Sequence, residues 1–159
     1  MLKVRCPKGA CPFGLAAKNL GYRAVLLIGQ DQRNKLPQNL LSDDIATFDY
    51  APYSQLFPRS MAIVHQGGIG TTAQALRSGR PMLIMPYSID QPDNAARAER
   101  LGVARTIKRT EYNAVTAAAE LKQLLNNPKY TEQATKVGQQ IQLENGVKTA
   151  CNAIEARSN

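Results

Sequence analysis

Three short apolar runs constrain the fold more than any other feature of the sequence: Ala24–Ile28, Ala62–Val64 and Met82–Met85. Gly29 follows the first run and Pro86 follows the third, so neither run continues as a longer helix. Continuous apolar runs of this length are typical of strands that are buried on both faces of a sheet. Segments with helical spacing lie between and after these runs, which favours parallel strands joined by crossover helices.

Weaker patterns complete the predicted fold. The segment Met1–Gly14 has no periodicity, and we expect it to be irregular. Further strands are expected at Asp44–Phe48 and Val103–Ile107. Helices are expected at Leu15–Leu20, Pro52–Leu56, Thr71–Ser78, Gln91–Leu101, after Asn113, after Asn127 and around Val147–Ile154. The sequence therefore predicts an α/β protein with a Rossmann-like open parallel sheet, covered by helices on both faces, whose ligands bind at the carboxyl ends of the strands.

Composition excludes several classes of protein. The 159 residues, 43% of them hydrophobic, suit one globular domain. No apolar run approaches the roughly 18 residues of a membrane helix, and no signal peptide is visible, so we expect a cytoplasmic protein without a membrane span. The three cysteines suggest reduced thiols rather than a disulfide framework. With His65 as the single histidine, we expect no metal site.

The formal charge of +8 raises the question of nucleic-acid binding. The basic residues are scattered, however, and no run of five or six occurs. No DNA-binding or RNA-binding module pattern is present. We therefore expect no nucleic-acid partner, and part of the positive charge suits attraction of a small phosphorylated ligand.

A glycine-rich segment, His65–Thr72, lies between a predicted strand and a predicted helix. Its glycines allow a sharp turn and a close approach of the backbone to a ligand. Thr71 and Thr72 fall at the start of the helix, where unpaired amides and the helix dipole attract anions. The segment predicts a phosphate or diphosphate site, with a tight turn capped by threonine as the purely structural alternative. It is neither a P-loop nor a G-x-G-x-x-G motif.

A second polar segment follows the strand at Met82–Met85. Asp90 and Gln91 lie where this strand gives way to the next helix, at the same edge of the sheet as Thr71. Adjacent carboxylate and amide groups suit hydrogen bonding to neighbouring hydroxyls of a sugar. The alternative is an Asp cap at the helix N-terminus.

Several motifs occur in one order: Tyr50-Ala51-Pro52, His65-Gln66-Gly67-Gly68-Ile69-Gly70-Thr71-Thr72, Gly79-Arg80-Pro81-Met82, Pro86 and Asp90-Gln91-Pro92-Asp93-Asn94-Ala95. Together they resemble the donor-binding signature of nucleotide-sugar glycosyltransferases with the GT-B fold. The pattern is similar to bacterial sterol, macrolide and glycopeptide glucosyltransferases, to UDP-glucosyl/glucuronosyltransferases and to the plant secondary-product glycosyltransferase box. The resemblance covers about Arg23 to Thr106.

The resemblance implies a role for each matching position. Tyr50 would stack on the nucleotide base, where the plant box has Trp, and Tyr53 falls where that box has Gln. Gln74 lies near the ribose-binding position, where Gln replaces Glu. Asp90 and Gln91 would hold hydroxyls of the transferred sugar. The donor diphosphate would be bound by His65, Gly68, Gly70, Thr71 and Thr72.

The resemblance also implies the reaction: an inverting, metal-independent transfer of a hexosyl group from a nucleoside-diphosphate sugar, UDP-glucose or similar, to an acceptor hydroxyl. The nucleotide sugar is a substrate, so no cofactor is expected. The general base lies on the acceptor-binding half in this family, so no catalytic residue is expected in this chain. We expect residues 1–22 to be an irregular segment and helix end that match the family poorly, and residues 23–159 to be the donor-binding domain.

The resemblance covers only the donor-binding half, so we expect the acceptor-binding domain to be absent from these 159 residues. We expect that domain, or a neighbouring polypeptide, to be the partner for transfer, and the chain alone to be inactive. Without that domain, the apolar surface on which it would dock is exposed, and self-association through this surface is a hypothesis. Two alternatives remain open: a non-catalytic nucleotide-sugar-binding remnant, and half of a nucleotide-sugar epimerase.

Overall fold

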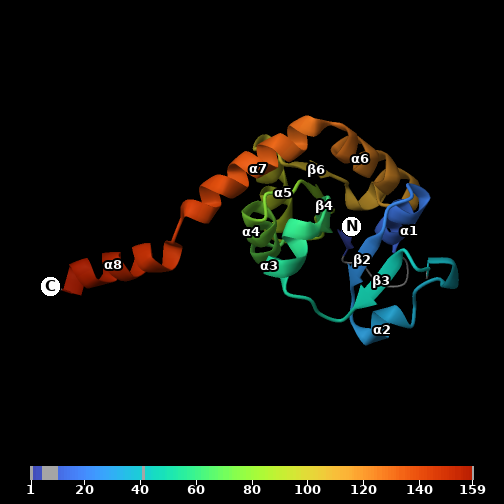
Figure 1. Ribbon diagram of the computed structural model, residues 1–159, viewed down its shortest axis with the longest axis horizontal. Helices are drawn as coiled ribbons and strands as arrows, with labels where there is room; N and C mark the ends of the chain where they lie inside the picture. The colour runs from blue at the N-terminus through green and yellow to red at the C-terminus, as the bar shows by residue number, and fades with distance from the viewer. Residues whose placement is uncertain (1, 5–10, 41, 159) are drawn as a thin grey trace.

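The computed structural model describes residues 2–4, 11–40 and 42–158. Within these residues, six parallel strands form one sheet in the order β3-β2-β1-β4-β5-β6 (Figure 1). This order is that of a doubly wound sheet, in which the strand order reverses beside β1 and leaves a crevice at the carboxyl edge. The predicted open parallel sheet is confirmed. The strands are β1 (Leu2–Val4), β2 (Ala24–Leu27), β3 (Ile45–Phe48), β4 (Ala62–His65), β5 (Met82–Ile84) and β6 (Ala104–Thr106).

Strand β1 corrects the expectation that Met1–Gly14 is irregular. Leu2 pairs with Ala24 of β2 on one side and with Ala62 of β4 on the other. The segment carries only three strand residues, with a lysine in the middle, which is too short for a recognisable period. Its strand conformation comes from the two neighbouring strands, so tertiary pairing decides the outcome here.

Helices cover both faces of the sheet, as predicted (Figure 1). On one face, α1 (Pro12–Asn19) and α6 (Ala114–Asn126) pack on Val64 and Leu83. On the other, Ile63, Met82 and Ile84 pack under the remaining helices. Because side chains alternate along a strand, β4 and β5 each supply both cores. The helices of the second face are α4 (Ile69–Arg77), α5 (Gln91–Arg100) and α7 (Pro128–Leu143), with the 3-10 turn η2 (Phe57–Arg59).

Four short elements lie in connections. The polar segment Gln30–Ser42, which holds Pro37, is typical of a loop in the sequence. In the structure it contains α2 (Gln30–Arg33) and the 3-10 turn η1 (Gln38–Leu40). Arg33 Nη2 donates to the carbonyl of Thr47 at 2.6 Å and ties this segment to β3. The remaining two are α3 (Tyr53–Leu56) and the 3-10 turn η3 (Arg109–Glu111).

Helix α6 confirms the predicted cap but shifts the predicted apolar face. Asn113 Oδ1 accepts from the amides of Val115 at 2.9 Å and Thr116 at 3.0 Å. The helical spacing of the sequence predicts that Val115, Ala118, Leu121 and Leu125 face the core, but Val115 is 79% exposed. Ala118 and Leu125 are partly buried, whereas Leu121, as predicted, is fully buried together with Ala117 and Leu124. Their spacing of four and three residues is an ordinary helical face, rotated from the predicted one.

Helix α7 crosses the end of α4 at a glycine–glycine contact. A Cβ atom on Gly138 would lie 2.6 Å from Cα of Gly79 and 3.1 Å from the carbonyl oxygen of Leu76. Gly79 itself ends α4 with φ +67°, a conformation that glycine adopts without strain. Only glycine at position 138 allows the two backbones to approach this closely.

Helix α8 (Gly146–Ser158) projects away from the other elements (Figure 1). Its helical spacing was predicted, but Val147 and Ile154 are 77% and 66% exposed. Leu143, just before it, is 88% exposed. Among the described residues, no helix has both the length and the apolar character to cross a membrane.

The cysteines correct one expectation. Cys11 is buried and disulfide-bonded, whereas Cys151 is a free, exposed thiol. Cys6 lies outside the described residues. Three cysteines are too few for a framework but sufficient for one bond, so the prediction of reduced thiols is wrong for Cys11.

Candidate functional site

The glycine-rich turn after β4 lies at the carboxyl edge of the sheet, next to the point where the strand order reverses. Gly67 has φ +89°. A Cβ atom there would lie 3.0 Å from Cγ2 of Ile84 and 3.1 Å from the carbonyl oxygen of Gln91. The turn therefore requires glycine for both its backbone conformation and its contact with β5 and α5.

His65 supports this turn from inside the protein. Its side chain is 2% exposed, and Nδ1 accepts a hydrogen bond from the Gly67 amide at 3.0 Å. Because Nδ1 accepts, the ring proton lies on Nε2, which faces Sδ of Met82 at 3.3 Å. A direct contact between the ring and a diphosphate requires one nitrogen to leave its protein partner.

The N-terminus of α4 follows directly. Gly68 is the capping residue, and Thr72 N–H donates to its carbonyl oxygen at 3.0 Å as the first bond of the helix. The amides of Ile69, Gly70 and Thr71 precede that bond and have no partner within the helix. Gly70 is exposed and has open space around its Cα, so a ligand can approach these amides. The hydroxyl of Thr72 donates back to the Gly68 carbonyl at 3.0 Å, which leaves Thr71 as the more accessible of the two threonines.

The loop from β5 to α5 is organised by Gln91. Its Oε1 accepts from the amides of Tyr87 at 2.8 Å and Ser88 at 3.3 Å. Ile89, at the tip, is 92% exposed and has φ +61°. A β-branched residue in the left-handed region is strained, and such strain concentrates in ligand-binding loops.

Asp90 does not act as the helix cap that was its structural alternative. It occupies the N-cap position of α5, but its carboxylate accepts no bond from the first-turn amides. Oδ2 instead accepts from Asn94 Nδ2 at 2.7 Å, and the same nitrogen donates to the Gly67 carbonyl at 2.9 Å. Asn94 thus joins the two predicted ligand loops. Sequence reasoning assigned it no role, although its place four residues after Asp90 on a helix is a usable signal.

Arg109 brings a cation to the same loop. Its guanidinium lies 3.8 Å from the ring centroid of Tyr87, and Nη2 donates to the Tyr87 hydroxyl at 2.8 Å. Among residues 2–4, 11–40 and 42–158, no three His, Cys, Asp or Glu side chains gather to form a metal site.

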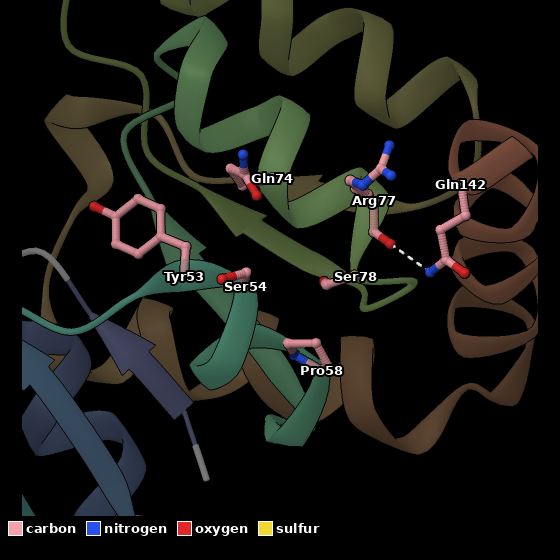
Figure 2. A pocket seen from close by; sticks show the side chains of 7 residues that line it. All are labelled: Tyr53, Ser54, Pro58, Gln74, Arg77, Ser78 and Gln142. Atoms are coloured by element: carbon pink, nitrogen blue, oxygen red, sulfur yellow. Dashed lines mark hydrogen bonds between the residues drawn. The ribbon is translucent and has the colours of Figure 1, made fainter. Parts of the chain in front are cut away.

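The structure separates the positions predicted to contact the nucleoside. Tyr50 follows β3 at the carboxyl edge and is 77% exposed. Tyr53 and Gln74 line a separate open cavity of about 480 Å³ between α3, α4 and α7 (Figure 2). Its wall includes Arg77, whose carbonyl accepts from Gln142 Nε2 at 2.8 Å. This cavity extends to the C-terminal end of α4, away from the glycine turn.

Fold and site together define a class. A doubly wound parallel sheet with a glycine turn, a helix N-terminus and a carboxylate loop at its carboxyl edge is the architecture of one half of a GT-B protein. Residues 17–147 match the family described as "Erythromycin biosynthesis protein CIII-like, C-terminal domain". The chain belongs to this family of glycosyltransferase domains, as the resemblance predicted.

Curated relatives agree with this assignment. The O-mycaminosyltylonolide 6-deoxyallosyltransferase of Streptomyces fradiae is 35% identical over 144 residues, which are 90% of this chain and 33% of that protein. The sterol 3-beta-glucosyltransferase of Saccharomyces cerevisiae (strain YJM789) is 39% identical over 119 residues, 75% of this chain and 9% of that protein. The chain thus spans a third or less of the length of these relatives.

Solved structures show the same fold. The glycotransferase of kitacinnamycin superposes with a TM-score of 0.81 at 22% identity, over 98% of this chain and 42% of that one. Glycosyltransferase VinC in complex with dTDP superposes with a TM-score of 0.79 at 23% identity, over 89% of this chain and 37% of that one.

Proposed function

We propose that this chain is the donor-binding half of an inverting glycosyltransferase and binds a nucleoside-diphosphate sugar at the carboxyl edge of its sheet. One observation carries the proposal: the glycine turn at the N-terminus of α4 and the Asp90 loop are joined by Asn94. An anion site and a hydroxyl-binding carboxylate held together suit a ligand that carries a diphosphate and a sugar. The names of the relatives, which are glycosyltransferases, support this reading.

The diphosphate lies at the start of α4 in this proposal. The free amides of the first turn, the positive end of the helix dipole and the Thr71 hydroxyl all favour an anion there. His65, Gly68, Gly70 and Thr72 shape the turn around it. When the glycosidic bond breaks, negative charge grows on the nucleoside diphosphate, and these fixed dipoles stabilise it.

The sugar lies beside the β5–α5 loop. Asp90 uses Oδ2 for Asn94, so Oδ1 is the oxygen available to a sugar hydroxyl. Gln91 uses Oε1 for the loop amides, so its Nε2 is the group available to donate. A carboxylate acceptor and an amide donor on adjacent residues match two neighbouring hydroxyls.

Tyr50 is the platform for the base, since its ring is exposed beside the same edge. Gln74 is assigned to the ribose with less support than Tyr50 has for the base, because Gln74 lies in the separate cavity with Tyr53 (Figure 2). The finer identity proposed for the donor is UDP-glucose or a similar hexose donor. VinC was solved with dTDP, so both UDP and dTDP are the ligands to compare.

Transfer requires a second half that binds the acceptor hydroxyl and carries the base. The relatives are more than twice as long as this chain, which leaves room for that half. The acceptor-binding partner is a separate domain or polypeptide in this proposal. The chain alone binds the donor and does not turn it over, and its exposed edge supports self-association at high concentration.

Calorimetric titration with UDP and dTDP tests the proposal. Gly70→Asp places a carboxylate at the start of α4, where there is open space for it, and should weaken nucleotide binding at least tenfold. Gly146→Asp is the matched control, because it makes the same change in open space at the start of α8. Absence of binding by the unmodified chain, or equal binding by both variants, would contradict the proposal.

A further inference from the structure

Asn94 uses one nitrogen to hold two loops. Nδ2 carries two hydrogens, and the structure gives each an acceptor: the Gly67 carbonyl at 2.9 Å and Asp90 Oδ2 at 2.7 Å. The first bond joins residues 27 apart in the sequence, and the second joins neighbours on one helix. The side-chain amide is therefore the link between the turn after β4 and the carboxylate after β5.

We propose that Asn94 is a positioning residue that aims the Asp90 carboxylate at the sugar and couples sugar recognition to diphosphate recognition. This role rests on the proposed function. Asn94 itself does not need to touch the ligand, because its donors are both engaged within the protein. Its effect passes through Asp90 on one side and through the Gly67 peptide on the other.

The two sides are not equally dependent on Asn94. Gly67 is also held by the bond from its amide to His65 and by packing against Ile84 and Gln91. Asp90 has no bond to the first-turn amides of α5, and its carboxylate accepts its hydrogen bond from Asn94 instead. Loss of Asn94 therefore frees the carboxylate more than it frees the turn. The consequence is a larger loss in affinity for a sugar nucleotide than for the bare nucleotide.

The test compares affinities for UDP and UDP-glucose, and for dTDP and dTDP-glucose, in the unmodified chain and in Asn94→Ala. We expect the affinity for the sugar nucleotide to fall about fivefold more than that for the nucleotide. A merely structural role would lower both affinities together. Asn94→Asp, which preserves side-chain size but places a carboxylate against Asp90, replaces the alanine variant if the latter does not fold.

Asp93→Ala is the matched control on the same helix. Asp93 pairs with Arg97 at 2.6 Å, and both side chains are mostly exposed. In the described part of the chain, this pair makes no side-chain hydrogen bond to the two loops. A surface pair of this kind contributes little, so the affinity ratio should stay at its original value. The control separates the loss of Asn94 from a general effect on α5.

Asp90→Ala tests whether Asn94 acts through the Asp90 carboxylate. If Asn94 acts through Asp90, then Asp90→Ala and the double variant have the same ratio of affinities, because the second change has nothing left to orient. An additive loss in the double variant would overturn the positioning role, as would an unchanged ratio in Asn94→Ala. If the unmodified chain binds none of the four ligands, the proposed function fails first and this role fails with it.

Discussion

The ring of His65 and the amide of Gly67, two residues apart, meet in a hydrogen bond of 3.0 Å to Nδ1. A buried side-chain acceptor thus holds the amide of the residue that makes the sharp turn, as an Asx turn does with an asparagine oxygen. This turn leads directly into α4 and sets the direction of the amides at the helix N-terminus. His65 therefore influences the anion site through the backbone conformation that it stabilises.

Two variants of His65 separate this role from direct contact with a diphosphate. His65→Asn retains an acceptor for the Gly67 amide, whereas His65→Leu leaves that buried amide unpaired, at a cost of about 1–3 kcal/mol. We expect His65→Leu to lose more UDP affinity than His65→Asn in calorimetric titration. Equal losses in both variants would instead indicate that the imidazole itself contacts the diphosphate.

Ile89→Gly should relieve strain at the tip of the β5–α5 loop. The left-handed conformation costs a residue with a Cβ about 1–2 kcal/mol, and glycine loses about 0.5–1 kcal/mol through the entropy of the unfolded chain. We expect the free energy of unfolding in urea to rise by up to about 1 kcal/mol. Ile69→Gly is the control, since Ile69 is also exposed but lies in the first turn of α4 without positive φ. Equal destabilisation in both variants would argue against strain at Ile89.

Gly138→Ala should separate α7 from the end of α4. The added Cβ would lie 2.6 Å from Cα of Gly79, so the helices must move apart, and we expect a loss of about 2–3 kcal/mol in unfolding free energy. Gly146→Ala adds the same methyl group in open space on α8 and should stabilise slightly. A Gly138→Ala variant as stable as the unmodified chain would contradict the close helix contact.

Tyr112 should make stability fall at high pH. Burial beside Phe13, with ring centroids 4.7 Å apart, raises the pKa of the Tyr112 phenol above its ordinary value of 10.0. Above pH 10 the unfolded chain loses this proton while the folded chain retains it, so the free energy of unfolding falls by up to about 1.4 kcal/mol per pH unit. Urea unfolding between pH 9 and 11 measures the slope. Tyr112→Phe should remove this contribution, and Tyr50→Phe, at an exposed ring, should not.

Local patterns predicted most of the fold. The runs at Ala24–Ile28, Ala62–Val64 and Met82–Met85 became strands, because continuous apolar side chains suit burial on both faces. Asn113 and Asn127 both cap the helices that they were expected to begin. Strand β1 was missed because three residues with a central lysine carry no period of their own. The apolar face of α6 was predicted only in part, with Leu121 correct and Val115 wrong, because alanines serve equally well on several faces.

The candidate site was also predicted in part: its ligand-binding residue types were visible in the sequence, and their partners were not. The glycine turn and the Asp90 pair were visible in the sequence, because turn geometry and ligand chemistry restrict the residue types. The partners of these residues were not visible. The bond from Asn94 to Gly67 joins residues that meet only when the start of α5 packs against the turn after β4, and the inward direction of His65 depends on Met82 in the next strand. Both are long-range contacts that no local pattern encodes.

Strand β1 also has a practical consequence. Among the strands that the structure describes, β1 alone pairs with both β2 and β4, so the sheet is continuous through the three residues Leu2–Val4. Deletion of Leu2–Val4 would divide the sheet into a two-stranded part, β3-β2, and a three-stranded part, β4-β5-β6. Any shortened version of the protein should therefore retain these three residues.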